Sequence, residues 1–259
     1  MNRTMALISL AAAFALQGCG VSMTGNISHD RAVQSHVHQV VPLARNGAVE
    51  VHNVSGDVRI STWNRPSVGV DAVIYGATAQ DVGNTEVDVH RDGDTVVIRT
   101  QYPHGGGFGQ SSGASVDYRV RLPSTAAVNV ANVDGTIAVA GVANTVNAAN
   151  VSGDVTVTGS GGDLKLATTS GDIDARAASV LGNGRIDIAS VSGTLHLHVP
   201  RSTSASVSAA SISGDFTSDF PLQSNKGTIG VKAAGTLGSG GATIKLASVS
   251  GSIELQATK

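Results

Sequence analysis

Four aspartates follow a glycine within a repeated motif and could supply oxygen ligands to a cation. They lie in the segments NVSGDV, TTSGDI and SISGDF, and they are Asp57, Asp154, Asp172 and Asp215. If the repeats stack, the last three would form an acidic row of the oxygen ligands that calcium prefers. Other repeats carry Thr136, Thr194 and Ser252 at the matching position, which interrupts the row. The pattern therefore favours aspartates that accept hydrogen bonds from turn backbone over a calcium site.

Two pairs of histidines, His36 with His38 and His196 with His198, could each offer two metal ligands. One residue separates the members of each pair, so in an extended strand both rings point to the same face. Two ligands do not complete a site, and no neighbouring cysteine or carboxylate completes an obvious set in the sequence. Solvent-facing histidines are the favoured interpretation, and we predict no metal and no other cofactor.

The sequence contains no recognisable catalytic motif. GxSxG, HExxH and a Ser/His/Asp grouping in a known context are all missing. Some β-helix enzymes cleave polysaccharides with carboxylates and aromatic side chains on one outer face, but aromatic residues make up only 3% of this chain. Trp63, the single tryptophan, is expected to cap the first coil. We predict a non-catalytic protein without catalytic residues, and the alternative is a polysaccharide-processing β-helix enzyme.

The first 18 residues resemble a secretory signal peptide, because Arg3 precedes an apolar run from Met5 to Leu16. The segment LQGC, which ends at Cys19, resembles the lipobox of bacterial lipoproteins, where cleavage before the cysteine accompanies its lipidation. Cys19 is the only cysteine, so lipidation also accounts for a lone thiol in an exported protein. A plain signal peptide that is cut nearby is the alternative.

The residues after Cys19 bear on localisation. Gly20 stands where an aspartate would favour inner-membrane retention, so by resemblance to proteobacterial sorting rules we expect an outer membrane lipoprotein, facing the periplasm or the cell surface. Residues 19–39 show little apolar periodicity and are expected to form a lipidated, flexible tether. A formal net charge of −2 gives no basic field that would hold nucleic acid or an anionic membrane surface.

The elements that must position these residues are strands. Gly accounts for 32 of 259 residues and charged residues for 14%, which favours short strands and tight turns. Residues 40–122 show period-two alternation, and Asp92-Gly93 predicts a hairpin turn. The segment 104–115 is rich in Gly and Ser and is expected to be a mobile loop. We predict an N-terminal β-strand region over residues 40–122.

Residues 123–259 contain repeats that predict a β-solenoid. Successive central glycines from Gly135 to Gly214 are 18, 18, 22 and 21 residues apart, a period that holds two short strands per coil. Glycine is expected at a corner between strands where φ is positive. The predicted corner glycines are Gly56, Gly135, Gly153, Gly171, Gly193, Gly214 and Gly251.

The same repeats predict a narrow apolar core. One column is expected to stack Ile137, Val155, Ile173, Leu195, Phe216 and Ile253. Within one repeat, Val151, Val155 and Val157 are expected to share the inward face, and Ser, Thr, Ala and Asn to point outward.

The segments GAVEVHNVSGDVRISTWNRPSVGVDA, VDVHRDGDTVVIRTQYP and VDYRVRLP, with the VSGDV repeats, resemble a putative-adhesin family of bacterial exported proteins with a domain of unknown function. The resemblance covers Ala48 to Lys259. It implies a single-stranded β-helix on the cell envelope and supplies no catalytic residues. We therefore expect a cell-envelope lipoprotein that binds a protein, a glycan or another copy through a rigid polar surface, or, as another alternative, an envelope-stress or assembly factor.

The segment ASVSGSIELQATK closes the sequence on a repeat strand. No polar cap follows Ile253 to Gln256, so this strand is expected to lie at an open end of the solenoid. We expect its edge, where Leu255 is apolar, to pair with another copy or with a strand of a partner. Simple solvation of the edge and self-capping by a loop are the alternatives.

Overall fold

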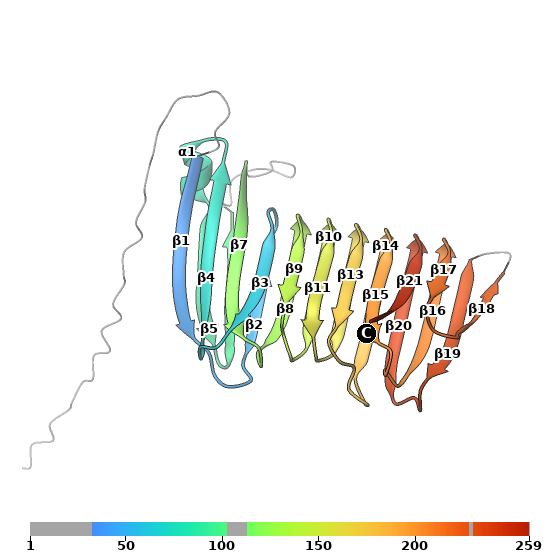
Figure 1. Ribbon diagram of the computed structural model, residues 1–259. Coiled ribbons are helices and arrows are strands. Elements are labelled where there is room, and N and C mark those ends of the chain that lie inside the picture. The colour runs from blue at the N-terminus through green and yellow to red at the C-terminus, as the bar shows by residue number, and fades with distance from the viewer. Residues whose placement is uncertain (1–32, 103–112, 228–229, 259) are drawn as a thin grey trace, which may run out of the picture.

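The protein consists of two long β-sheets that lie face to face, as Figure 1 shows for the computed structural model. The structure describes residues 33–102, 113–227 and 230–258. Within these ranges α1 (Ala79–Asn84) is the single α-helix, and no helix is long and apolar enough to cross a membrane. The fold is all-β and solenoid-like, as predicted.

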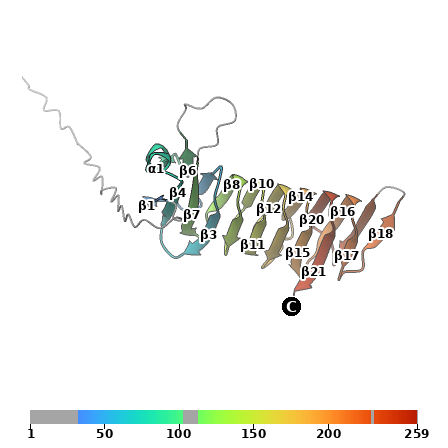
Figure 2. The ribbon, with the colours of Figure 1, turned by 90° about the horizontal axis from the view of Figure 1, so that it is seen from above.

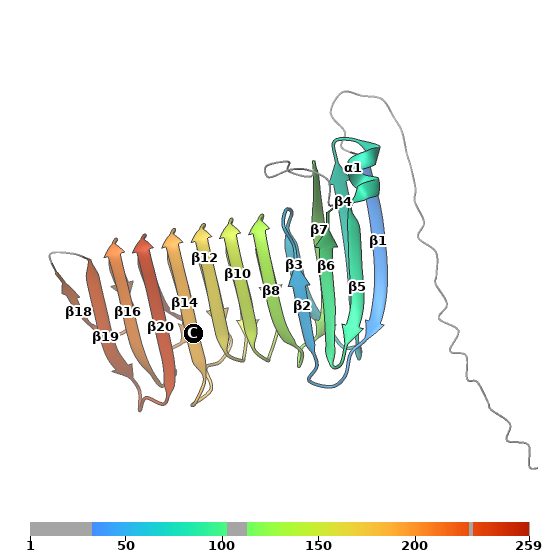
Figure 3. The same ribbon diagram turned by 180° about the vertical axis from the view of Figure 1, so that it is seen from behind.

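The two sheets run the length of the molecule (Figures 1 and 3). Sheet A has the spatial order β1 (Val33–Pro42), β4 (Ser67–Gly76), β7 (Ala114–Pro123), β3 (Val58–Trp63), β9 (Ile137–Ala140), β11 (Val155–Ser160), β13 (Ile173–Ala177), β15 (Leu195–Pro200), β21 (Ile253–Thr258) and β17 (Phe216–Ser218). Sheet B has the order β18 (Gln223–Lys226), β19 (Val231–Leu237), β16 (Ala205–Ser213), β20 (Ala242–Ser250), β14 (Arg185–Ser192), β12 (Leu164–Ser170), β10 (Val146–Ser152), β8 (Ala127–Asp134), β2 (Ala48–His52), β6 (Thr95–Gln101) and β5 (Glu86–Asp92).

Each coil joins one strand of sheet B to the next strand of sheet A, and neighbouring coils pair in parallel. In β10, for example, Val146 and Ala148 are buried while Ala149 is exposed, as period-two alternation requires. The predicted apolar column is confirmed, because Ile137, Val155, Ile173, Leu195, Ile253 and Phe216 are register partners in that spatial order. The core is therefore a thin apolar layer between the sheets.

The corner glycines pack directly on one another. All seven predicted corner glycines have positive φ, as shown by Gly153 at +114°. A Cβ on Gly153 would lie 2.4 Å from the carbonyl oxygen of Gly135 in the neighbouring coil, well inside van der Waals contact. Both the backbone conformation and the space between coils therefore require glycine at this corner.

Antiparallel strands close the molecule beyond the first coil, β2–β3. In sheet A, β4 pairs antiparallel with both β1 and β7, and in sheet B the β5–β6 hairpin pairs with β2. The hairpin prediction at Asp92-Gly93 is confirmed by the β5–β6 pairing and by φ of +57° at Gly93. The capping box of Thr78 and Asp81 starts α1 beside these strands (Figure 2).

The predicted boundaries in this region need two corrections. Residues 33–39, expected in a flexible tether, belong to β1, because the alternating side chains of 33–42 cover the edge of β4. Ala114 and Ser115, expected in a mobile loop, begin β7. The signal segment 1–18, Cys19 and residues 103–112 lie outside the described residues.

The coil order at the other end also differs from the prediction. β20 lies between β14 and β16, and β21 lies between β15 and β17, so the β20–β21 coil sits inside the stack. Leu255 is fully buried. The expectation of an open edge at β21 is wrong, because strands β17, β18 and β19 lie beyond it and Phe220 and Leu222 pack against the core there.

Candidate functional site

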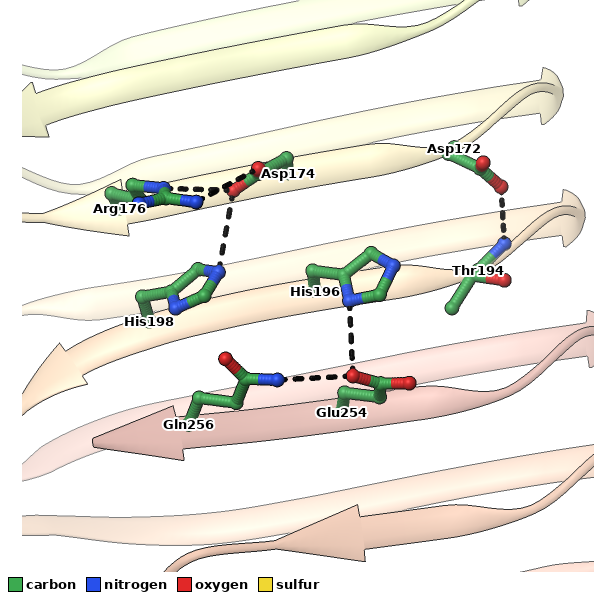
Figure 4. A network of polar contacts seen from close by, with 8 residues as sticks. All are labelled: Asp172, Asp174, Arg176, Thr194, His196, His198, Glu254 and Gln256. Carbon is green, nitrogen blue, oxygen red and sulfur yellow. Dashed lines mark hydrogen bonds and ion pairs between the residues drawn. The ribbon is translucent and has the colours of Figure 1, made fainter. Parts of the chain in front are cut away.

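Three of the four aspartates after the corner glycines connect one coil to the next, whereas Asp215 Oδ1 accepts a hydrogen bond of 2.9 Å from Lys226 Nζ. Asp57 Oδ1 accepts a hydrogen bond of 2.9 Å from the backbone N–H of Thr136, and Asp154 Oδ1 accepts one of 2.9 Å from that of Asp172. Asp172 Oδ1 accepts a bond of 2.7 Å from Thr194 (Figure 4). These contacts satisfy turn backbone, as the sequence favours. Within the part of the chain that the structure describes, no three His, Cys, Asp or Glu side chains gather as a metal site.

A buried polar column lies just inside the same corners. That Ser, Asn and Thr side chains beside a corner satisfy its backbone follows from the sequence, but their burial as one continuous column was not predicted. Asn150 Nδ2 donates to the carbonyl oxygens of Gly135 and Gly153, at 2.7 and 3.0 Å, and Thr168 Oγ1 donates to that of Gly153 at 3.3 Å. The column consists of Asn53, Asn132, Asn150, Thr168, Ser190, Ser248 and Ser211. The available signal was that the residue three positions before each corner glycine is always Asn, Thr or Ser.

The predicted histidine pairs point to one face each, and both lie on the outer surface of sheet A. His36 and His38 are exposed on β1, and His38 contacts Asp71. On β15, His196 Nδ1 lies 3.2 Å from Glu254, and His198 Nε2 lies 3.5 Å from Asp174 (Figure 4). These cross-strand ion pairs connect three neighbouring strands, β13, β15 and β21.

Two perturbed groups lie in these ion-pair networks. Burial, and then the positive charge of Arg176, lower the pKa of His198 below its ordinary value. Burial acts to raise the pKa of Asp71, but hydrogen bonds from His38 and Arg121 outweigh burial and hold this pKa below its ordinary value. The contacts of Asp71 thus favour its charged form, whereas the surroundings of His198 favour the neutral imidazole.

Trp63 lies on the outer surface of sheet A rather than over the end of a coil, which corrects the expectation of a cap. Its ring lies against Gly69, and its Nε1 donates to the carbonyl oxygen of Ser67 at 2.8 Å. The guanidinium carbons of Arg65 and Arg121 each lie 5.0 Å from the ring centroid.

A shallow groove of about 580 Å³ lies on the same outer surface of sheet A. It runs between arginines of β3 and β7 and small residues of β9 and β11.

The outer surface of sheet B has a different character, because it carries two adjacent apolar columns. One is an outward alanine column made of Ala131, Ala149, Ala167, Ala189, Ala247 and Ala210. The other stands beside the corners and is made of Val54, Val133, Val151, Val191, Val249 and Ile212, with Thr169 in the one coil that lacks a large apolar residue. We call these two columns together the Ala–Val face.

The second column corrects the prediction for Val151. This residue was expected inward with Val155 and Val157, but 48% of its surface is exposed while both others are buried. Of the eight large hydrophobic side chains that are exposed within the described residues, six belong to this column. Contiguous exposed apolar surface of this kind usually marks an interaction site. The outward alanines were expected, but the expectation of a polar surface is wrong where this column runs along sheet B.

The Ala–Val face is hollowed in two places. A depression of about 310 Å³ lies over Ala131, Ala149 and Ala167. A larger one of about 780 Å³ lies over Ala189, Ala210 and Ala247, and it is bordered by Val191, Ile212 and Val249. Aliphatic groups thus line an open surface that follows the long axis of the solenoid.

A family model described as Toastrack DUF4097 matches residues 41–256. No curated protein matches the chain. Among solved structures, the chain is similar to a putative cell adhesion protein from Clostridium sporogenes, at 11% identity and a TM-score of 0.47, with 86% of this chain and 100% of that chain covered. It is also similar to a putative adhesin from Bacteroides fragilis, at 11% identity and a TM-score of 0.36, with 85% and 97% covered. A third similar structure is a putative lipid binding protein from Parabacteroides distasonis, at 12% identity and a TM-score of 0.32, with 85% and 96% covered.

Proposed function

The chain belongs to the Toastrack family DUF4097, and from this premise and the Ala–Val face we propose that it is a non-catalytic, adhesin-like or scaffold lipoprotein of the cell envelope. The observation that carries the proposal is the exposed apolar column from Val54 to Ile212. Water-exposed valines are unfavourable for a free protein surface, and a partner that covers them gains their transfer free energy.

Rigidity supports a binding role for this face. Each coil is hydrogen-bonded to its neighbours, and the packed corner glycines and the hydrogen bonds of Asn150 and Thr168 fix the position of the corners. The Ala–Val face is therefore held in one shape before a partner arrives, and little conformational entropy is lost on binding. A preorganised flat surface of this kind fits contact with an extended partner rather than catalysis.

The binding role is tested by placing charges on the face. The double variant Val151→Asp with Val191→Asp should abolish the attachment of cells that carry the protein to one another or to a surface. Val40→Asp is the matched control, since Val40 is 53% exposed on β1, outside the Ala–Val face. Equal attachment by the double variant, the control and the parent would contradict a binding role for the Ala–Val face.

The proposed envelope anchor rests on the sequence LQGC at residues 16–19. We propose lipidation of Cys19 and attachment to the outer membrane. Cys19→Ser should shift the protein from the membrane pellet to the soluble or unprocessed fraction. Unchanged membrane retention with normal processing would exclude the anchor. Protease treatment of intact and permeabilised cells then distinguishes a surface-facing protein from a periplasmic one.

A further inference from the structure

Charged side chains beside the Ala–Val face indicate what covers it. The outward residues of the adjacent column include Glu50, Asn129, Asn147, Lys165, Asp187 and Lys245, which neighbour one another in that spatial order. Lys165 of β12 and Asp187 of β14 are direct register partners at the middle of this column. The next outward pair is Asp163, which precedes β12, and Arg185 of β14. Opposite charges thus face each other across the boundary between β12 and β14.

This arrangement is self-complementary under a two-fold rotation. An axis parallel to the strands, in the interface plane and above the β12–β14 boundary, places β12 of one copy over β14 of the other. It places each column over its own counterpart, so the alanines meet alanines, and Val133, Val151 and Val191 meet Ile212, Val249 and Thr169 of the second copy. Val54 lies beyond the paired coils, because β2 falls over β19. Lys165 then faces Asp187 of the second copy, and Arg185 faces Asp163 of the second copy. A two-fold axis generates each of these contacts twice.

Resting on the proposed binding role of this face, we propose that its partner is a second copy of this chain, related by that two-fold axis. Such homotypic pairing would join protein molecules on one envelope or on two. Within one copy, Asp187 already lies 3.1 Å from Arg185, while Lys165 forms no ion pair with another described residue. The second copy therefore supplies the carboxylate that Lys165 does not hold in the single chain.

The size of the face fits a dimer. The axis superimposes six of the seven coils, from β8 to β16. At about 4.8 Å per strand, with three outward residues on each strand, these coils give a surface roughly 30 Å long and roughly 20 Å wide. Pairing would cover roughly 600 Å² on each copy, near the ~800 Å² per partner of a standard specific interface. Four charge-assisted contacts at its centre would fix the register of the two copies.

The decisive experiment mixes two charge reversals, each made in the full chain with Cys19→Ser so that it can be purified without lipid. We expect the parent to be a dimer in sedimentation equilibrium. Lys165→Asp and Asp187→Lys should each raise the dissociation constant more than about tenfold, because each places like charges opposite one another twice. An equimolar mixture should form heterodimers, since every introduced charge then faces its opposite.

Mixing separates contacts between copies from contacts within one chain. Lys165 and Asp187 are neighbours in the single chain, and an intrachain effect cannot be repaired by adding another molecule. Melting temperatures of both variants provide the check that they remain folded. A monomeric parent at the highest accessible concentration, or a parent dimer whose two variants fail to form heterodimers, would overturn the proposed pairing.

The mixing experiment tests the pairing of two copies, and the attachment test tests the binding role of the Ala–Val face, so either proposal can fail while the other stands. A monomeric parent whose attachment still depends on Val151 and Val191 would leave the binding role standing with a different partner. Heterodimer formation together with attachment that ignores both valines would support the pairing and refute the adhesin-like role.

Discussion

Gly153→Ala is the substitution whose cost follows most directly from the geometry of the stack. Gly153 has φ of +114°, a conformation that side chains with a Cβ rarely adopt, and its Cβ would lie 2.4 Å from Gly135 O and 2.9 Å from Gly135 C. Both contacts are with backbone, so no side chain can rotate away. The neighbouring corner must move, although it is held by the 2.8 Å bond from Gly153 N to Ser170 O on one side and the 3.1 Å bond from Gly135 N to Ser152 O on the other.

The expected cost is the sum of two effects. The backbone conformation contributes about 1–3 kcal/mol, and the forced separation of two packed coils contributes a further ~1–3 kcal/mol. Gly153→Ala should therefore lower the free energy of unfolding by about 2–6 kcal/mol. Urea unfolding followed by circular dichroism measures this change, with the slope of the transition as a check that the unfolded state is unchanged.

Two other variants make the test discriminating. Gly83→Ala changes a glycine of α1 with no atom within 4 Å of the added Cβ, and it should be neutral or stabilising by up to ~1 kcal/mol. Asp154→Ser should cost only about 0.5–1.5 kcal/mol, because Ser252 already accepts a bond from Asp215 N, at 3.4 Å. If Gly153→Ala costs no more than either variant, the reasoning about the stacked corner is refuted.

Two further predictions concern buried and titrating side chains. Leu255→Lys should lower the free energy of unfolding by more than about 4 kcal/mol, because it places an ammonium group in the core. The control Thr217→Lys, on the exposed side of β17, should change it by less than ~0.5 kcal/mol. Equal melting temperatures of the two variants would contradict the internal position of β21. Folding lowers the pKa of His198, so as the pH falls the unfolded chain binds a proton at this ring before the folded chain does. The stability that the neutral ring contributes is therefore fully present above about pH 6.5 and is lost as the pH falls below that value. His198→Gln should flatten the pH dependence of the melting temperature over this range relative to a control such as His90→Gln on the exposed β5–β6 hairpin, and an unchanged slope would refute this assignment.

The repeat architecture could be predicted because its strongest determinants are local. A corner that needs positive φ leaves glycine in every repeat, and period-two alternation identifies the inward residues of each strand. The alternation fails across the corner, however, because the chain leaves one sheet and enters the other between Val151 and Val155. Within β10 alone, every second residue from Val146 through Ala148 to Asn150 is buried, so the same alternation correctly places Val151 on the outward face.

The remaining differences arise from interactions that one repeat does not contain. Nearly identical corners such as those of Ser211 and Ser248 fit the same neighbour, so the sequence cannot rank β16 against β20 as the coil that pairs with β14. The strand β1 lacks a strong apolar pattern because it is the outermost strand of sheet A, where its inward side chains are only partly buried and just Val33, Val37 and Val41 pack against the core. Likewise, the Ala–Val face became evident only when the register aligned residues from seven coils.

The internal position of the β20–β21 coil has a consequence for the order of folding events. Residues 205–218 are synthesised before residues 242–258, yet they occupy the outer place in the stack. A β16 strand that paired with β14 before β20 was available would have to release it again, because β20 occupies that place in the finished stack. The strand order thus requires β20 and β21 to be inserted between coils whose corners are nearly identical to their own, a competition of the kind that produces kinetic traps.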